Sequence, residues 1–194
     1  AGWTSTADPA EAIGTVRMIS CASFGAMPEL SLFARLHDAW HSVVTLTDTP
    51  EVIHASLAGG PTNPKSLPGL SGFLAAHAQL PDGTSVAIQI ADRAGLDRRT
   101  LDVLGHDGSV LATDDGYDLF SLETGPVDAR EGSRTVAVHE LIGNDLRRLI
   151  DRPAAAPRLD GRELRKTLAC CQACVLSIRT GQPERPAKFL DMGP

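Results

Sequence analysis

The sequence has no long hydrophobic run, since its uninterrupted apolar stretches extend over only a few residues. A helix that spans a bilayer needs about 20 consecutive, mostly apolar residues, so we expect no membrane span. The first residues, AGWTSTAD, have neither the basic start nor the apolar core of a signal peptide. Basic clusters are scarce as well: Arg147, Arg148 and Arg152 form the nearest one, in a chain of net charge −6. We therefore expect neither a nucleic-acid partner nor a membrane partner.

A glycine-rich turn for a dinucleotide is also missing. No predicted strand is followed by G-x-G-x-x-G and a helix. The pair Gly59-Gly60 precedes Pro61 and opens no helix. We expect this chain to bind no nicotinamide cofactor by itself.

The cysteines are not spaced like a disulfide framework. Cys170, Cys171 and Cys174 lie close together on a stretch of helical character, and Cys21 stands alone. This spacing favours a reducing, cytoplasmic location. Small apolar residues surround the three neighbouring cysteines, so we interpret them as packing residues. Thiol redox sensing is the alternative interpretation.

The length of 194 residues fits a single domain over residues 1–194. Apolar residues at helical spacing predict helices over residues 29–47 and 161–180. Two apolar runs joined by Pro81-Asp82-Gly83-Thr84 predict a β-hairpin over residues 72–92. Further strands are expected in succession rather than in alternation with helices, which indicates an α+β fold with a largely antiparallel sheet. Residues 123–133 read as irregular, a strand is expected at 136–141, and a helix at 140–151.

Three stretches carry a resemblance to a known family: LPDGTSVAIQIADR, LDVLGHDGSVL and GRELRKTLACCQACVLSIRTGQP. In their order and spacing they resemble the C-terminal half of Gfo/Idh/MocA oxidoreductases over residues 13–186. The resemblance implies an open, mostly antiparallel mixed sheet of about six strands with helices packed on one face. It also implies a domain that shapes a substrate pocket and forms a homo-oligomer through its exposed sheet face. The NAD or NADP of the full-length enzyme would bind a separate N-terminal domain.

The family places a histidine on the first helix of this domain, pointing at the nicotinamide and preceded by an aspartate. The corresponding helix here carries His37, Asp38 and His41, which we take as candidate catalytic residues. His37 and His41 lack the family's aspartate four residues earlier, but they share one helix face. Such a pair could bind a metal with Asp38, although we expect none. The structural alternative is a polar stripe at the helix edge.

Trp40 and Arg93 are candidate substrate-binding residues. Trp40 lies on the same helix and either packs in the core or forms part of a sugar-facing wall. Arg93, next to Asp92, could face a pocket or pair with a neighbouring charge on the surface. The run Asp97-Arg98-Arg99 allows the same two interpretations.

These observations predict the substrate-side and dimerisation domain of an NAD(P)-dependent oxidoreductase that acts on a sugar, a polyol or a related small hydroxy compound. Such a domain would not be catalytically competent alone. A stand-alone, non-catalytic binding or assembly subunit of the same fold is one alternative. A metal- or thiol-dependent enzyme that uses the histidine pair or the cysteine cluster is another.

Overall fold

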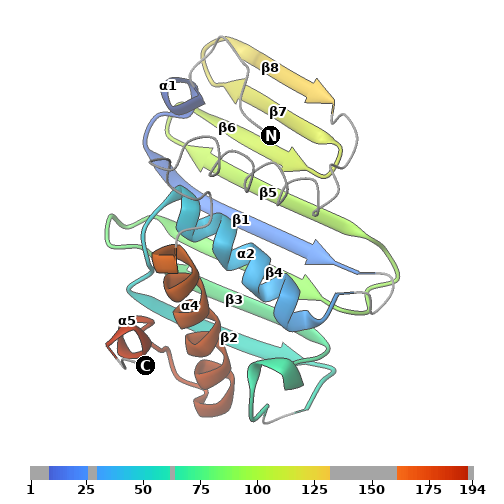
Figure 1. The fold of residues 1–194 in the computed structure, drawn as a ribbon. Helices are drawn as coiled ribbons and strands as arrows, with labels where there is room; N and C mark the ends of the chain where they lie inside the picture. Colours follow the sequence, from blue (N-terminus) through green and yellow to red (C-terminus); the bar gives the residue numbers. More distant parts are fainter. Residues whose placement is uncertain (1–8, 26–29, 62–63, 132–160, 192–194) are drawn as a thin grey trace, which may run out of the picture.

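The computed structural model describes residues 9–25, 30–61, 64–131 and 161–191 (Figure 1). A single sheet of eight strands runs through the molecule in the order β2-β3-β4-β1-β5-β6-β7-β8. Its strands are β1 (Val16–Phe24), β2 (Val52–Ala58), β3 (Phe73–Gln79), β4 (Ser85–Ala91), β5 (Arg98–Gly105), β6 (Gly108–Thr113), β7 (Gly116–Ser121) and β8 (Gly125–Glu131). The helices are α1 (Pro9–Ile13), α2 (Leu32–Leu46), the short 3-10 helix η1 (Leu67–Gly69), α4 (Gly161–Thr180) and α5 (Ala187–Leu190).

The predicted class is confirmed, and the predicted number of strands is corrected. The sheet is mixed and mostly antiparallel, because among the described strands only β1 and β4 pair in parallel. It has eight strands rather than about six. One of them, β8, lies in the stretch that was expected to be irregular. The strand expected at residues 136–141 and the helix expected at 140–151 lie outside the described residues.

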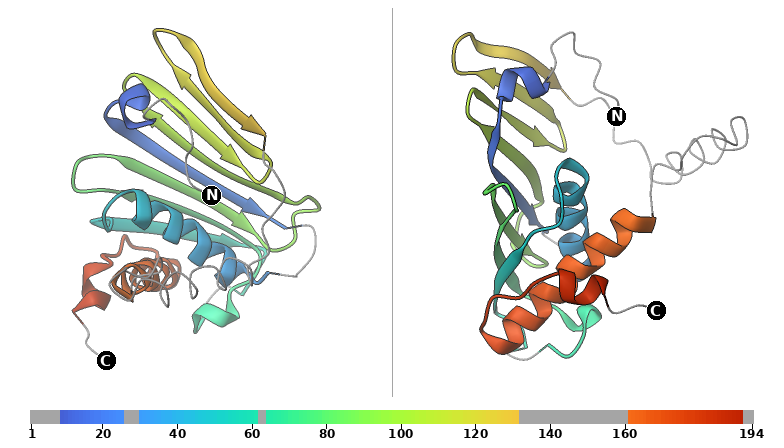
Figure 2. Two further views of the ribbon diagram at one scale, coloured as in Figure 1. Left: turned by 45° about the horizontal axis from the view of Figure 1, so that its top comes forward. Right: turned by 90° about the vertical axis from the view of Figure 1, so that its left-hand side faces the viewer.

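The helices lie on one face of the sheet, as the resemblance implied. Figure 2 shows α2 and α4 side by side against the same face, over the half of the sheet formed by β1 to β4. The short helix α1 packs on β6 and β7 near the other edge. We call the covered side the helix face and the other side the open face. No described helix is long and apolar enough to cross a membrane.

Alternation along the strands separates the two faces. On β4, Val86, Ile88 and Ile90 are buried beneath the helices, whereas the residues between them point to the open face. Helix α2 begins at Ser31, whose side chain accepts a hydrogen bond from the amide of Ala34. It presents an apolar stripe to the sheet, formed by Leu32, Leu36, Ala39, Trp40, Val43 and Val44.

Two local contacts explain the best-predicted elements. In the turn between β3 and β4, Asp82 accepts a hydrogen bond from the amide of Thr84, and Gly83 has a φ of 87°, which glycine adopts without strain. Helix α4 is tied to the edge strand β2, because the hydroxyl of Ser177 accepts a hydrogen bond from the amide of Ala55. These contacts hold the hairpin and the closing helix where the sequence pattern predicted them.

Candidate functional site

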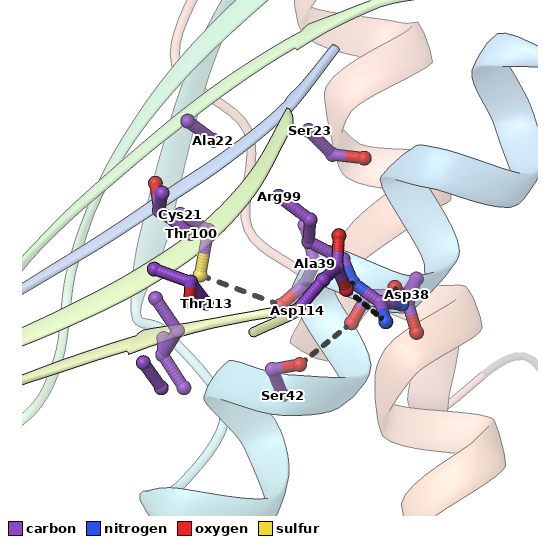
Figure 3. Close-up of a pocket in the computed structure, with 12 residues that line it drawn as sticks. Cys21, Ala22, Ser23, Asp38, Ala39, Ser42, Arg99, Thr100, Thr113 and Asp114 are labelled. Carbon is purple, nitrogen blue, oxygen red and sulfur yellow. Dashed lines mark hydrogen bonds and ion pairs between the residues drawn. The ribbon is translucent and has the colours of Figure 1, made fainter. Parts of the chain in front are cut away.

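A small cavity opens on the helix face, beside α2 and above the ends of three strands. Its volume is about 160 Å³. Helix α2 contributes one wall, and neighbouring positions of β1, β5 and β6 contribute the floor (Figure 3). The lining residues are Cys21, Ala22, Ser23, Asp38, Ala39, Ser42, Arg99, Thr100, Leu101, Ala112, Thr113 and Asp114.

Three charged side chains meet at this cavity, and we call them the Asp38–Arg99–Asp114 triad. Arg99 Nη1 donates a hydrogen bond to Asp38 Oδ2 at 2.9 Å. Arg99 Nε donates to Asp114 Oδ1 at 2.8 Å, and Nη2 lies 2.6 Å from the same oxygen. One guanidinium thus joins helix α2 to the end of β6, as Figure 3 shows.

Electrostatics hold the arginine charged but add little stability. Burial disfavours the charge of Arg99, yet its hydrogen bonds to Asp114 and Asp38 outweigh burial and raise the pKa of the guanidinium. The side chains of Arg99, Asp38 and Asp114 remain 56%, 50% and 52% exposed. Ion pairs this exposed contribute about 0–1 kcal/mol each. A ligand that binds in the cavity can therefore rearrange the triad at a small cost in free energy.

A second arginine lies behind the cavity wall. Arg35 is buried on α2, and its Nη1 donates to Ser23 Oγ at 3.2 Å and to the carbonyl of Phe24 at 3.2 Å. Gly25 leaves room for it, since a Cβ there would lie 2.1 Å from Arg35 Nη2. Arg35 thus fixes the end of β1 and the orientation of the cavity residue Ser23.

Of the three candidate catalytic residues, only Asp38 reaches the cavity. His37 and His41 do not line it. Their rings stack on each other with centroids 6.2 Å apart, and Phe33 contacts the edge of the His37 ring. Burial, and secondarily the neighbouring His41, lower the pKa of His37, while Asp38 opposes them. His37 therefore favours its neutral form.

The two candidate substrate-binding residues lie away from the cavity. Trp40 has no exposed surface, and its Nε1 donates to Cys174 Sγ at 3.2 Å. Trp40 therefore packs in the core and does not form part of a sugar-facing wall. Arg93 is exposed in the loop after β4 and does not line the cavity.

The cysteines are core residues, in agreement with the packing interpretation. Cys170, Cys171 and Cys174 are buried between α4 and its neighbours. Burial raises the pKa of all three thiols, to about 12 for Cys174. Cys21 reaches the cavity, but burial, aided by Asp38, raises its pKa to about 12. Within the described residues, no three His, Cys, Asp or Glu side chains are placed to hold a metal ion.

Sequence reasoning missed Arg99 and Asp114 as partners of Asp38. The signal for Arg99 was the charged run Asp97-Arg98-Arg99, which allowed either a pocket or a surface ion pair. Asp114 gave no signal beyond its place in a turn. Pairing of β5 with β6 brings the two together, because Thr100 lies opposite Thr113.

Comparison with known proteins identifies the fold rather than a close relative. No protein-family model matches the sequence. No curated protein matches it either. Solved structures do match: levoglucosan dehydrogenase in complex with NADH and levoglucosan aligns with a TM-score of 0.70 at 11% identity, over 90% of this chain and 60% of that one.

Two further solved structures agree. An oxidoreductase from Agrobacterium radiobacter, in complex with NAD+, L-tartaric acid and magnesium, has a TM-score of 0.70 at 12% identity, over 93% of this chain and 59% of its own. UDP-N-acetylglucosamine 3-dehydrogenase from Acidithiobacillus ferrooxidans has a TM-score of 0.72 at 13% identity, over 88% of this chain and 56% of its own. The chain spans about 60% of the length of the levoglucosan dehydrogenase it matches. At these identities the likeness is one of fold: the sheet and helices of this chain are arranged as in these dehydrogenases and oxidoreductases.

Proposed function

We propose that this chain is the substrate-side domain of an NAD(P)-dependent oxidoreductase that acts on a sugar, a polyol or a related small hydroxy compound. The observation that carries the proposal is the small cavity beside α2, lined by the Asp38–Arg99–Asp114 triad, in a fold shared with dehydrogenases solved with NADH and levoglucosan or L-sorbose. Hydroxyl groups, an arginine and two carboxylates around a small cavity suit a ligand rich in hydroxyl groups. Residues 1–194 act as one domain in this proposal.

Within this cavity, Asp38 is the residue through which α2 would contact the substrate. Of the candidate catalytic residues His37, Asp38 and His41, it is the one that lines the cavity. Its carboxylate lines the cavity and is held by Arg99 at 2.9 Å. The nicotinamide would be supplied by a separate cofactor-binding domain, so the chain alone would bind substrate without transferring hydride.

The open face of the sheet would form a homo-oligomer. Leu104, Leu111 and Phe120 come from the adjacent strands β5, β6 and β7 and are 37%, 37% and 43% exposed. They alternate with Val103, Val110 and Leu119, which are buried on the helix face. In the register of the sheet these three side chains are diagonal neighbours, with Ser109 between Leu104 and Phe120. Exposed apolar side chains grouped on one face of a sheet favour an interaction surface. A second copy of the chain is the occupant that a symmetric assembly would place there.

A reducing compartment such as the cytoplasm suits the proposal. All four cysteines are free thiols and are buried. Proteins of oxidising compartments more often use their cysteines in disulfides.

The test is a dehydrogenase assay of the gene product that carries this chain. Levoglucosan, L-sorbose and a panel of other sugars and polyols are supplied with NAD+ or NADP+, and reduced nicotinamide is followed by absorbance. We expect turnover of at least one neutral polyhydroxy compound. Asp38→Asn should lower kcat/KM, whereas Asp115→Asn, outside the cavity, should leave it unchanged. Absence of turnover with every pair of cofactor and compound would contradict the proposal.

A stand-alone binding or assembly subunit is the second candidate. It is favoured because the two candidate catalytic histidines, His37 and His41, do not line the cavity. This candidate predicts a stable oligomer that binds polyols and never reduces NAD(P)+. Sedimentation and the dehydrogenase assay together distinguish it from the first proposal.

A further inference from the structure

Among the residues that line the cavity the charges are unbalanced, while Arg35, behind the wall, directs its guanidinium to Ser23 and to the carbonyl of Phe24 and does not line the cavity. The Asp38–Arg99–Asp114 triad contains two carboxylates and one guanidinium, so it carries a net negative charge when all three groups are ionised. The other polar lining residues, Ser23, Ser42, Thr100 and Thr113, are uncharged.

Arg99 is already committed to this triad. Its Nε, Nη1 and Nη2 each face a carboxylate oxygen of Asp38 or Asp114 at 2.6–2.9 Å. A ligand anion would have to compete with both carboxylates for that guanidinium. It would also lie close to their negative charge, and like charges in one site repel.

The carboxylates, by contrast, retain acceptor capacity. Asp38 Oδ2 and Asp114 Oδ1 accept from Arg99. In the described part of the chain, the other oxygen of each carboxylate has no hydrogen-bond partner. A carboxylate accepts several hydrogen bonds, so these oxygens suit hydroxyl or ammonium donors. Arg99 Nη1 and Nη2 each carry a second hydrogen that a ligand hydroxyl oxygen accepts.

We propose that the Asp38–Arg99–Asp114 triad selects the charge of the substrate: it accepts neutral or amino-substituted polyhydroxy compounds and disfavours those that carry a carboxylate or phosphate. This inference rests on the proposed function, because it takes the cavity as the substrate site. The fold leaves the matter open, since one solved relative contains levoglucosan and another contains L-tartaric acid. The residues of this chain, rather than its architecture, decide the preference.

The test uses three probes that share a pyranose ring: glucose, glucosamine and glucuronate. Binding to the full 194-residue chain is measured by titration calorimetry at low ionic strength. We expect glucose and glucosamine to bind about fivefold or more tightly than glucuronate, the size of a charge interaction near a protein surface. Added salt should reduce this difference in affinity, because screening weakens the charge interaction.

Two neighbouring variants separate the triad from general surface charge. Asp114→Asn removes one charge of the triad and should narrow the gap between glucose and glucuronate about threefold to fivefold. Asp115→Asn removes the same charge one residue along the same turn, outside the cavity lining, and should leave the gap unchanged. Circular dichroism of both variants confirms that they remain folded.

Each other outcome overturns the inference. Glucuronate binding as tightly as glucose, an equal effect of the two variants, or no binding of any probe would each refute charge selection by the triad. Failure of the proposed function would look different, because the gene product would then turn over no compound with NAD(P)+ while the preference among the three probes persisted.

Discussion

The hydrogen bond between Trp40 and Cys174 joins α2 to α4 and offers a test of the core. Trp40 is the largest fully buried side chain among the described residues, and its Nε1 donates to Cys174 Sγ at 3.2 Å. Both side chains have no exposed surface. The perturbation is a double-mutant cycle of Trp40→Phe, Cys174→Ala and the two combined.

The expected magnitudes follow from burial and from the unpaired donor. Trp40→Phe removes part of a buried ring and should cost about 1–3 kcal/mol of unfolding free energy. Cys174→Ala leaves the indole N–H buried without an acceptor, which adds about 1–3 kcal/mol to the loss of the sulfur. In the double variant that stranded donor is gone. Its cost should therefore fall below the sum of the single costs by about 1 kcal/mol.

Urea unfolding followed by far-UV circular dichroism measures all four free energies, since it does not depend on the tryptophan signal. A domain is stable by about 5–15 kcal/mol, so both single variants should still fold. Strict additivity of the two substitutions would refute the hydrogen bond. Weaker sugar binding by Trp40→Phe without any loss of stability would refute the packing role of Trp40 and restore the sugar-facing interpretation.

Three further outcomes are expected. Leu111→Asp on the open face should dissociate the oligomer in light-scattering measurements, while Leu46→Asp, equally disruptive in chemistry but on the exposed end of α2, should not. Cys21 should resist iodoacetamide in the folded chain and react fully in denaturant, as seen by mass spectrometry, because burial raises its pKa to about 12 and keeps the thiol protonated. The lowered pKa of His37 means that the unfolded chain takes up its proton first, so stability should fall as the pH drops below the ordinary histidine pKa of about 6.5. His37→Gln should flatten that dependence in urea midpoints measured across this range.

Elements with local signals were predictable from the sequence. The turn Pro81-Asp82-Gly83-Thr84 specified the hairpin of β3 and β4, because its chemistry acts within the turn itself. Helix α4 begins and ends at the predicted residues, Gly161 and Thr180.

Elements that depend on distant neighbours were missed. The strand β8, with the sequence GPVDARE, alternates apolar and polar residues only from Val127 to Arg130, a run too short beside Gly125 and Pro126 to predict a strand, so its pairing with β7 is the evidence for it. Helix α1 has only five residues, too few to be stable without packing on β6 and β7. Both were therefore outside the reach of pattern reasoning.

The site illustrates the same limit. Asp38 and Arg99 are 61 residues apart and meet because β1 and β5 are neighbours in the sheet beneath α2. Nothing in the local sequence of Arg99 distinguished it from Arg93, since each lay in a charged stretch after the hairpin. The family's helix position drew attention to His37 and His41, but helical geometry turns Asp38 and Ser42 toward the cavity instead.

The two proposals about this chain can be tested separately because successive residues of a strand point to opposite faces. Arg99 and Leu104 both belong to β5, yet Arg99 contacts α2 on the helix face, and Leu104 lies on the open face next to the buried Val103. Leu111→Asp should therefore change the oligomeric state and leave the preference for glucose over glucuronate intact. Asp114→Asn should do the reverse. If either substitution altered both properties, the strands would transmit changes between the faces, and neither the oligomer nor the charge selection could be assigned to one face alone.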